Sequence, residues 1–430
     1  MVTAGGKAVG MVGLPEPFIP LRKNDLVEAL CGDGCVPVDE QPSFRTLCRL
    51  IGAIYHAEFL RILDGLKNAY APFDPDADTK LIIPDAAGPK QQKLNDLFAE
   101  FSSLMARADF RHLSSDDMEL ALHARSHWGL DMDVDFRVFE RLAIFARGDT
   151  HERRTRRRPW KPWQEVEVDV PIYQRLVMIL KLRQHPRISQ EIDTDKVYLQ
   201  VFKSIPKLDI RMLLPGARVR INPVDRGKIG LSLLSGLGLT LWRVVGTALS
   251  HIVDILWLNI NPIALWGLVF GAFSYGAKSF FDYQRTKERY NLSLTTILYF
   301  QNLDTNAGVL YRLVDEAEEQ ECRETILAYY LLWKIGGAQG CTAEQLHALV
   351  RAEVERTAGV AVTFVVRDTL DKLMRLSLVE KVATGYRARP LPVAIETLGW
   401  TWAGLCKYNS PAARPSPAGE PRPARASTIP

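Results

Sequence analysis

Apolar and polar residues alternate with a helical period over much of the first 128 residues. Apolar side chains recur every three or four positions, which is the spacing of an amphipathic helix with one buried face. This spacing predicts four helices, over 21–30, 44–69, 90–108 and 115–128. We therefore expect a helical N-terminal domain over 18–128, preceded by a flexible arm over 1–17 that is rich in glycine.

The pattern changes after residue 129. Short segments alternate apolar and polar residues or carry β-branched side chains, as Glu165–Val170 and Val197–Phe202 do. Segments with proline, glycine or charge separate them. The pattern over 173–182 fits a helix and a strand equally. These features predict an α+β domain over 129–228, with a sheet that is antiparallel or mixed.

A strongly apolar stretch covers residues 229–281. Its second run, Pro262–Phe281, has Lys278 as its only charge, and a helix of that length rises about 30 Å, enough to cross the hydrocarbon of a bilayer. Together with the run over 229–253, it predicts a two-helix transmembrane hairpin. One alternative is a pair of buried helices in a large core. Another is that the first run lies along the membrane surface.

Charge around this stretch predicts its orientation. Basic residues lie outside both ends of the hairpin, whereas the turn Trp257–Pro262 has none. By the positive-inside rule, both termini then face the cytoplasm. Six cysteines in 430 residues do not make a disulfide framework, which agrees with a reducing compartment. We expect a bacterial inner membrane, or the mitochondrial inner membrane in a eukaryote.

Helical spacing returns after the hairpin, and juxtamembrane helices are expected over 282–321. Helices over 322–335, 342–357 and 368–376 precede a strand, a turn and a strand over 378–389. This is the order of a winged-helix domain, which we place at 322–395. Residues 410–430 are mainly proline, alanine and arginine, and we expect them to be disordered. The predicted fold class is an α+β region with a transmembrane hairpin and a C-terminal winged-helix-like domain.

Ionisable residues inside the apolar stretch are the first candidates for function, because each costs about 2.5–3.5 kcal/mol at mid-bilayer. They are Arg243, His251, Asp254 and Lys278. These residues would line a polar seam between helices, or would lie near the helix ends and extend to the headgroups.

A run of arginines is the second candidate. Arg153, Arg154, Arg156, Arg157 and Arg158 fall within six positions and would contact acidic lipid headgroups, with a solvated loop as the alternative. The net charge of the chain is only +4, and acidic residues dilute the basic face of the winged-helix segment. Both observations argue against nucleic acid as a partner.

The third candidate is a polar segment just after the hairpin. Asn302, Asp304 and Asn306 would form a functional surface there, with a capped loop as the alternative. Small residues at four-residue spacing in the hairpin permit close helix packing and hence a homo-oligomer. No complete metal-binding, phosphate-binding or nucleophile motif is present, so we assign no catalytic residue, metal or cofactor.

Several motifs follow one another in a characteristic order. They are Phe18–Lys23, Gly148-Asp149, Pro215–Arg220, Asp225–Gly230, Tyr299–Gly308, Asp315–Glu319 and Glu324–Tyr329. In this order they resemble the transmembrane protein 143 family over about residues 18–390. The resemblance implies an integral membrane protein with a hairpin and no assigned activity, so it supplies no catalytic residues.

Together these patterns predict a membrane-anchored scaffold or regulatory protein. Its partners would be the lipid bilayer and proteins that bind its cytoplasmic domains. A small channel or transporter assembled from hairpins is the first alternative, and an enzyme at the membrane surface is the second. The lack of a catalytic motif favours a role other than catalysis.

Overall fold

The computed structural model describes residues 18–32, 36–78, 89–114, 131–158, 161–220, 288, 292, 295, 299–337, 339–363 and 365–406. The chain divides into two compact units, each made of three separate stretches of sequence. Unit 1 comprises Met1–Arg22, Phe59–Glu321 and Arg351–Val365. Unit 2 comprises Lys23–Glu58, Cys322–Val350 and Val366–Pro430.

The N-terminal region is helical, as its period predicts. Its helices are α1 (Lys23–Gly32), α2 (Gln41–Tyr70) and α3 (Lys90–Arg107), with a short 3-10 turn, η1 (Ala71–Phe73), after α2. The buried side chains of α3 recur every three or four residues; they are Leu94, Leu97, Phe98, Phe101, Leu104 and Met105. This is the apolar stripe that predicted the helix. The helix expected over 115–128 lies outside the described residues.

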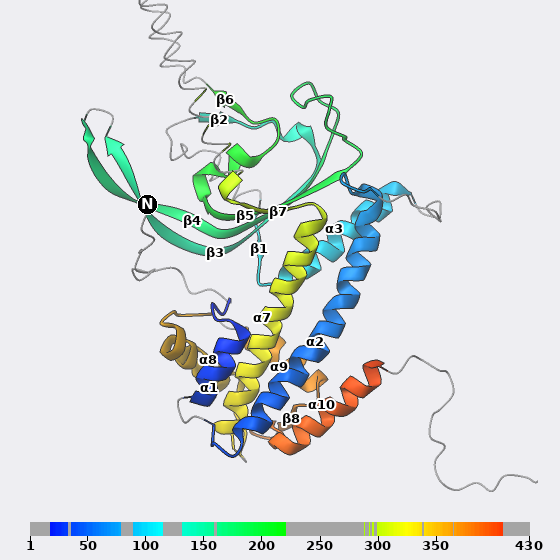
Figure 1. Ribbon diagram of the computed structural model, residues 1–430, viewed down its shortest axis with the longest axis vertical. Helices are drawn as coiled ribbons and strands as arrows, with labels where there is room; N and C mark the ends of the chain where they lie inside the picture. Colours follow the sequence, from blue (N-terminus) through cyan, green and yellow to red (C-terminus); the bar gives the residue numbers. More distant parts are fainter. Residues whose placement is uncertain are drawn as a thin grey trace, which may run out of the picture. The chain divides into compact units, whose positions relative to one another are not determined.

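Unit 1 is built on a five-stranded antiparallel sheet with the strand order β1-β3-β4-β5-β7 (Figure 1). Its strands are β1 (Arg111–His112), β3 (Phe139–Arg158), β4 (Lys161–Leu182), β5 (Val197–Pro206) and β7 (Asn302–Thr305). Every pairing in this sheet is antiparallel, which is one of the two arrangements that the sequence left open. The ambiguous segment 173–182 is part of strand β4. A separate ladder joins β2 (Asp131–Asp133) to β6 (Arg218–Arg220).

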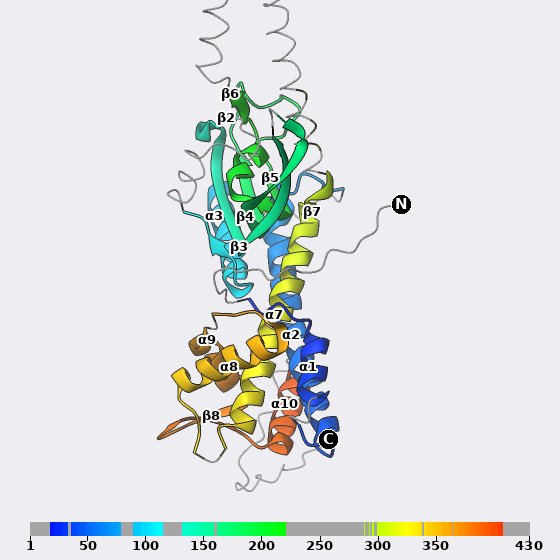
Figure 2. The same cartoon turned by 90° about the vertical axis from the view of Figure 1, so that its left-hand side faces the viewer.

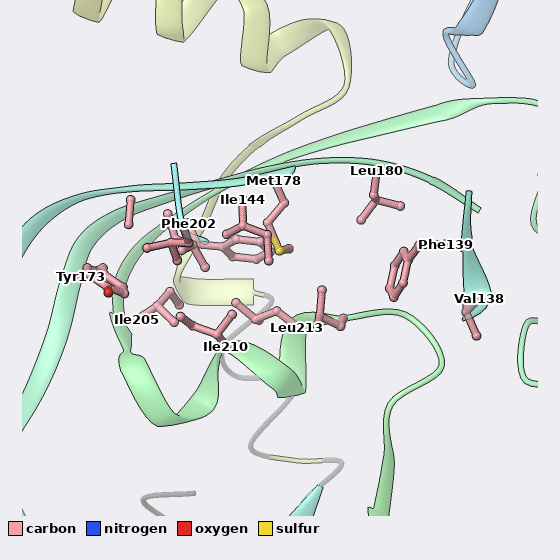
Figure 3. Packing of buried hydrophobic residues seen from close by; sticks show 14 of the residues in the cluster. Val138, Phe139, Ile144, Tyr173, Met178, Leu180, Phe202, Ile205, Ile210 and Leu213 are labelled. Atoms are coloured by element: carbon pink, nitrogen blue, oxygen red, sulfur yellow. The ribbon is translucent and has the colours of Figure 1, made fainter. Parts of the chain in front are cut away.

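The main core of unit 1 covers one face of this sheet. Ile144, Met178 and Phe202 project from the strands towards Ile210 and Leu213 of the 3-10 helix η3 (Lys207–Leu213), as Figure 3 shows. The other face carries Phe145, whose ring centroid lies 6.0 Å from that of Phe101 in α3. The sheet of unit 1 is therefore covered on both faces by other elements of the same unit.

A line of kinks crosses the sheet where β5 ends. Gly148 in β3 and Ser204 in β5 both adopt left-handed backbone angles, with φ of 81° and 52°. A Cβ atom at Gly148 would lie 2.6 Å from Cγ of Gln174 on the neighbouring strand, so glycine is required for space as well as for φ. Strand β5 ends two residues beyond this line, at Pro206 opposite Ile172, and from there the described parts of β3 and β4 pair with each other as a two-stranded ribbon.

Unit 2 is helical with one small hairpin. Its elements include α9 (Val366–Arg375), strands β8 (Val379–Val382) and β9 (Gly385–Ala388), and helix α10 (Leu391–Cys406). Helices α2, α7 (Ala307–Lys334) and α8 (Ala343–Ala358) contribute residues to both units. Figure 2 shows unit 2 with α9 and β8 to the left of α7, and α1 to its right.

Aromatic side chains and buried hydrogen bonds hold unit 2 together. Phe44 of α2 stacks on Trp333 of α7 with 6.1 Å between ring centroids. The hydroxyls of Tyr55 and Thr325 lie 2.8 Å apart in the interior, and the Tyr329 hydroxyl donates to the carbonyl of Arg389. Thr342 and Gln345 exchange two hydrogen bonds at the start of α8, which confirms the predicted capping box.

In the part of the chain that it describes, the structure contradicts the predicted membrane anchor. Over the described ranges, no helix combines the length and the apolar character needed to cross a bilayer. Helices α2 and α7, with 30 and 28 residues, are long enough but carry charged side chains along their length. The α+β fold with its antiparallel sheet therefore replaces the predicted transmembrane fold class. Within the described part of the chain, this finding overturns the predicted integral membrane scaffold, its channel alternative and the inner-membrane location.

Three predicted segments lie outside the residues that the structure describes. They are the hairpin itself at 229–281, the N-terminal arm at 1–17 and the C-terminal tail at 410–430. The juxtamembrane region is described in part. There, strand β7 and the start of α7 occupy 302–321, where we expected helices alone.

Candidate functional site

The first predicted set of site residues has no structural description. Arg243, His251, Asp254 and Lys278 all fall between residues 221 and 287, outside the described residues. The polar seam therefore supports no argument about function.

The arginine run lies in the two-stranded ribbon. Arg153 to Arg158 form the end of β3, and their pairing partners on β4 include acidic residues. Asp169 is opposite Arg153, and Glu165 is opposite Arg157. Directly opposite residues of an antiparallel pair are neighbours on the same side of the sheet. The backbone pairing thus sets acidic residues of β4 opposite arginines of β3, so the ribbon does not carry basic residues alone.

The polar segment at 302–306 is a structural junction. Asn306, with φ of 48°, follows β7 and precedes α7. Its side-chain oxygen accepts from the backbone N–H of Leu199 at 3.3 Å and from the Tyr70 hydroxyl at 3.4 Å, and its amide nitrogen donates to Asp76 at 2.6 Å. Burial raises the pKa of Tyr70, so its hydroxyl stays protonated as a donor. Asn306 therefore joins α2, β5 and α7.

The other two residues of this segment differ in their side-chain contacts. Asp304 forms an ion pair with Arg312, two turns further along in α7. The side-chain oxygen of Asn302 is buried and has no hydrogen-bond partner among the described residues. The structure thus brings the three residues together along the chain but does not gather their polar groups into one exposed surface.

Sequence reasoning missed a buried ion-pair cluster in unit 1. Arg147 of β3 is 8% exposed, and its guanidinium donates to the carbonyl of Ala108 at 2.9 Å and to Glu316 of α7 at 2.5 Å. The rings of Phe18 and Phe110 lie 4.2 and 4.4 Å from its Cζ. Burial lowers the pKa of Arg147, and the charge of Glu316 opposes that effect.

Further polar pairs extend this cluster along α7. Gln320 donates to Asp109 at 2.7 Å, and Glu321 receives two hydrogen bonds from Arg107 at 2.6 and 2.9 Å. Gln320 and Glu321 continue the buried stripe of Leu310, Leu313 and Ala317. In the sequence, the available signal for this cluster was the presence of polar residues at positions of α7 that continue its apolar stripe. Because each charge here meets a neighbouring group, the cluster fixes α7 on the sheet and does not present reactive groups.

The thiols and the metal-ligating side chains of the described residues form no site. Across the part of the chain that is described, no group of three or more His, Cys, Asp or Glu side chains could hold a metal ion. Cys31 and Cys48 are buried, and burial raises the pKa of both thiols. Thiolate is the form that binds metals and attacks electrophiles, so these thiols are inert.

The clearest accessible feature of unit 2 is helix α10. Leu391, Ala394 and Leu398 are buried, but the last turns of the helix are exposed. Trp400 is 70% exposed and Trp402 is 37% exposed. The sequence gives no direct signal for this, because an apolar helix of 16 residues with Glu396 as its one charge reads as a buried core helix.

Comparison with known proteins finds a similarity over part of the chain. Residues 139–308 match the profile of a family described as a protein of unknown function, DUF3754. This match starts at the first residue of β3 and ends at the second residue of α7. It covers less than half of the chain. No solved structure matches the chain significantly. The resemblance to the transmembrane protein 143 family is not tested by these findings and stays a prediction.

Proposed function

We propose that this protein is an adaptor that binds a partner protein through helix α10 of unit 2. The observation that carries the proposal is the exposed Trp400 in a helix with a single charged residue. Exposed tryptophans are rare on a surface that only water contacts, and tryptophan is among the residues that contribute most to protein–protein binding.

The surroundings of Trp400 support this reading. Val393 on the same helix is 43% exposed, and Thr401, Ala403 and Gly404 are exposed as well. The exposed end of α10 is therefore apolar on more than one side. A helix with this character normally packs against another surface, and an apolar groove on a partner protein is the surface that fits it.

Ion pairs in unit 2 favour a protein partner over nucleic acid. Lys372 of α9 lies 2.7 Å from Asp368 and 3.3 Å from Glu324. Arg375 pairs with Glu58, and Arg387 of the hairpin pairs with Glu380. Binding to DNA or RNA depends on basic side chains that neutralise phosphates. Here Lys372, Arg375 and Arg387 already have carboxylate partners.

A photo-crosslinking experiment tests the proposal. A photoreactive amino acid at position 401, next to Trp400, should give a discrete covalent adduct in cells. The same amino acid at Val38, which is 82% exposed on another part of unit 2, is the control and should give none. Trp400→Ala in the crosslinking chain should abolish the adduct. Failure to form an adduct, or an adduct that persists without Trp400, would overturn the proposed docking role.

A further inference from the structure

The outward side of α10 carries a regular stripe. Val393, Glu396, Trp400, Ala403 and Gly404 are exposed and follow one another at spacings that return to one side of a helix. The buried residues Leu391, Ala394 and Leu398 lie on the opposite side. Trp400 is the one large side chain near the end of this stripe, and the two residues one turn after it are small.

Two glycines in α10 have no packing role inside unit 2. A Cβ atom added at Gly399 or at Gly404 would meet nothing within 4 Å. Glycine in a helix interior costs roughly 0.5–1 kcal/mol relative to alanine. No contact within the described structure offsets that cost. Gly404 is instead placed to leave a hole on the outward stripe, one turn from Trp400.

We propose that the partner of α10 is a second copy of this chain, bound antiparallel, with Trp400 of each copy packed against Ala403 and Gly404 of the other. This inference rests on the proposed docking role of α10. A two-fold axis opposite position 402 brings both tryptophans over both holes at once, as a self-complementary interface requires. Each copy supplies both halves of the contact, because Trp400 and the small pair Ala403 and Gly404 lie on the same stripe.

Charge selects the antiparallel arrangement. Glu396 is the only charged residue of α10. A parallel pair would place the two Glu396 carboxylates opposite each other, and like charges in contact are destabilising. About the axis at position 402, the two Glu396 residues lie twelve helical positions apart, or roughly 18 Å along the helices. Salt screens exposed charges at this distance.

The accessible area sets the strength of this dimer. A tryptophan side chain contributes at most about 250 Å², so a 70% exposed Trp400 offers roughly 175 Å² per copy. Even with the neighbouring small residues, the contact stays well below the roughly 1,200–2,000 Å² of stable complexes. We therefore infer a transient dimer that dissociates on dilution.

Sedimentation velocity on the purified full-length chain tests this inference. Over a concentration series, the 48.4 kDa chain should shift reversibly towards a species of twice that mass. Trp400→Ala should weaken the dimer about thirtyfold, the change expected at an interface hot spot. Gly404→Leu fills the hole and should also abolish the dimer, although the open space around Gly404 leaves the fold of unit 2 intact. Val38→Ala is the matched control and should leave the dimer unchanged.

The crosslinker at position 401 separates this inference from the proposed function. With the purified chain, an adduct of twice the chain mass that needs Trp400 and is lost in Gly404→Leu supports the dimer. A chain that stays monomeric at every concentration, but forms a Trp400-dependent adduct of another mass in cells, overturns the dimer and leaves the docking role. If no adduct forms in either setting, both fall. Circular dichroism of each variant verifies that it is folded.

Discussion

At the scale of single residues, Arg147 shows how this fold accommodates a charge in its interior. Its guanidinium has a carbonyl and a carboxylate as acceptors, and two aromatic rings lie close to its Cζ. Aromatic faces attract cations, and the planar guanidinium stacks on them well. The carboxylate of Glu316 is the partner on which this arrangement depends, because it alone among these groups carries the opposite charge.

Removing that carboxylate charge should destabilise unit 1 strongly. Glu316→Gln keeps the shape of the side chain but leaves Arg147 buried without its counter-charge, and we expect a loss of about 3–5 kcal/mol. Urea unfolding followed by circular dichroism measures the change. The control is Glu28→Gln, which breaks the exposed pair with Arg45 and should change the midpoint little. Equal midpoints for the two variants would show that the buried pair is not important for stability.

At the scale of elements, Gly148 determines the course of strand β3. Gly148→Ala forces a side chain into a left-handed conformation and against Gln174, which should cost about 2 kcal/mol or more. Gly65→Ala in α2 is the opposite case, because that exposed helical position is open. We expect it to stabilise the protein by about 1 kcal/mol. Thermal unfolding of the two variants should shift in opposite directions, and a shift of Gly148→Ala to higher temperature would contradict our account of the kink.

The kink at Gly148 also explains why the helices could be predicted from sequence more closely than the long strands. The helical stripes of α1, α2 and α3 are regular, and their positions follow from spacing alone. In β4, Tyr173 and Leu176 belong to the same core although they are three residues apart. A regular strand would place them on opposite faces. The irregularity next to Gly148 shifts the alternation, so the long strands β3 and β4 could not be read as one continuous ribbon.

The candidate site depends on information that the sequence does not contain locally. The exposure of Trp400 follows from where α10 extends beyond the elements that cover Leu391 and Leu398. The pairing of Arg147 with Glu316 joins residues 169 positions apart.

At the scale of the whole molecule, neither unit is a continuous piece of sequence. Each unit combines an N-terminal stretch with stretches from the second half of the chain. The family match at 139–308 covers most of the sheet of unit 1 and the 3-10 helix η3 on one face, but not the elements on the other face. It leaves out β1 and α3, which contact β3. It also leaves out Glu316.

Because the family match leaves out β1, α3 and Glu316, we predict that the matched region does not fold alone. A fragment of residues 139–308 would expose Phe145 and leave Arg147 without its carboxylate, so the sheet would lose the cover of one face. A fragment of residues 59–321 retains α3, β1 and the first half of α7, and it contains all of the shorter fragment as a matched control. We expect cooperative thermal unfolding for 59–321 and a broad, non-cooperative profile for 139–308. A cooperative transition in 139–308 at the same temperature would show instead that the strands alone specify the core around Met178 and Phe202, and that the helices of unit 1 add no stability to it.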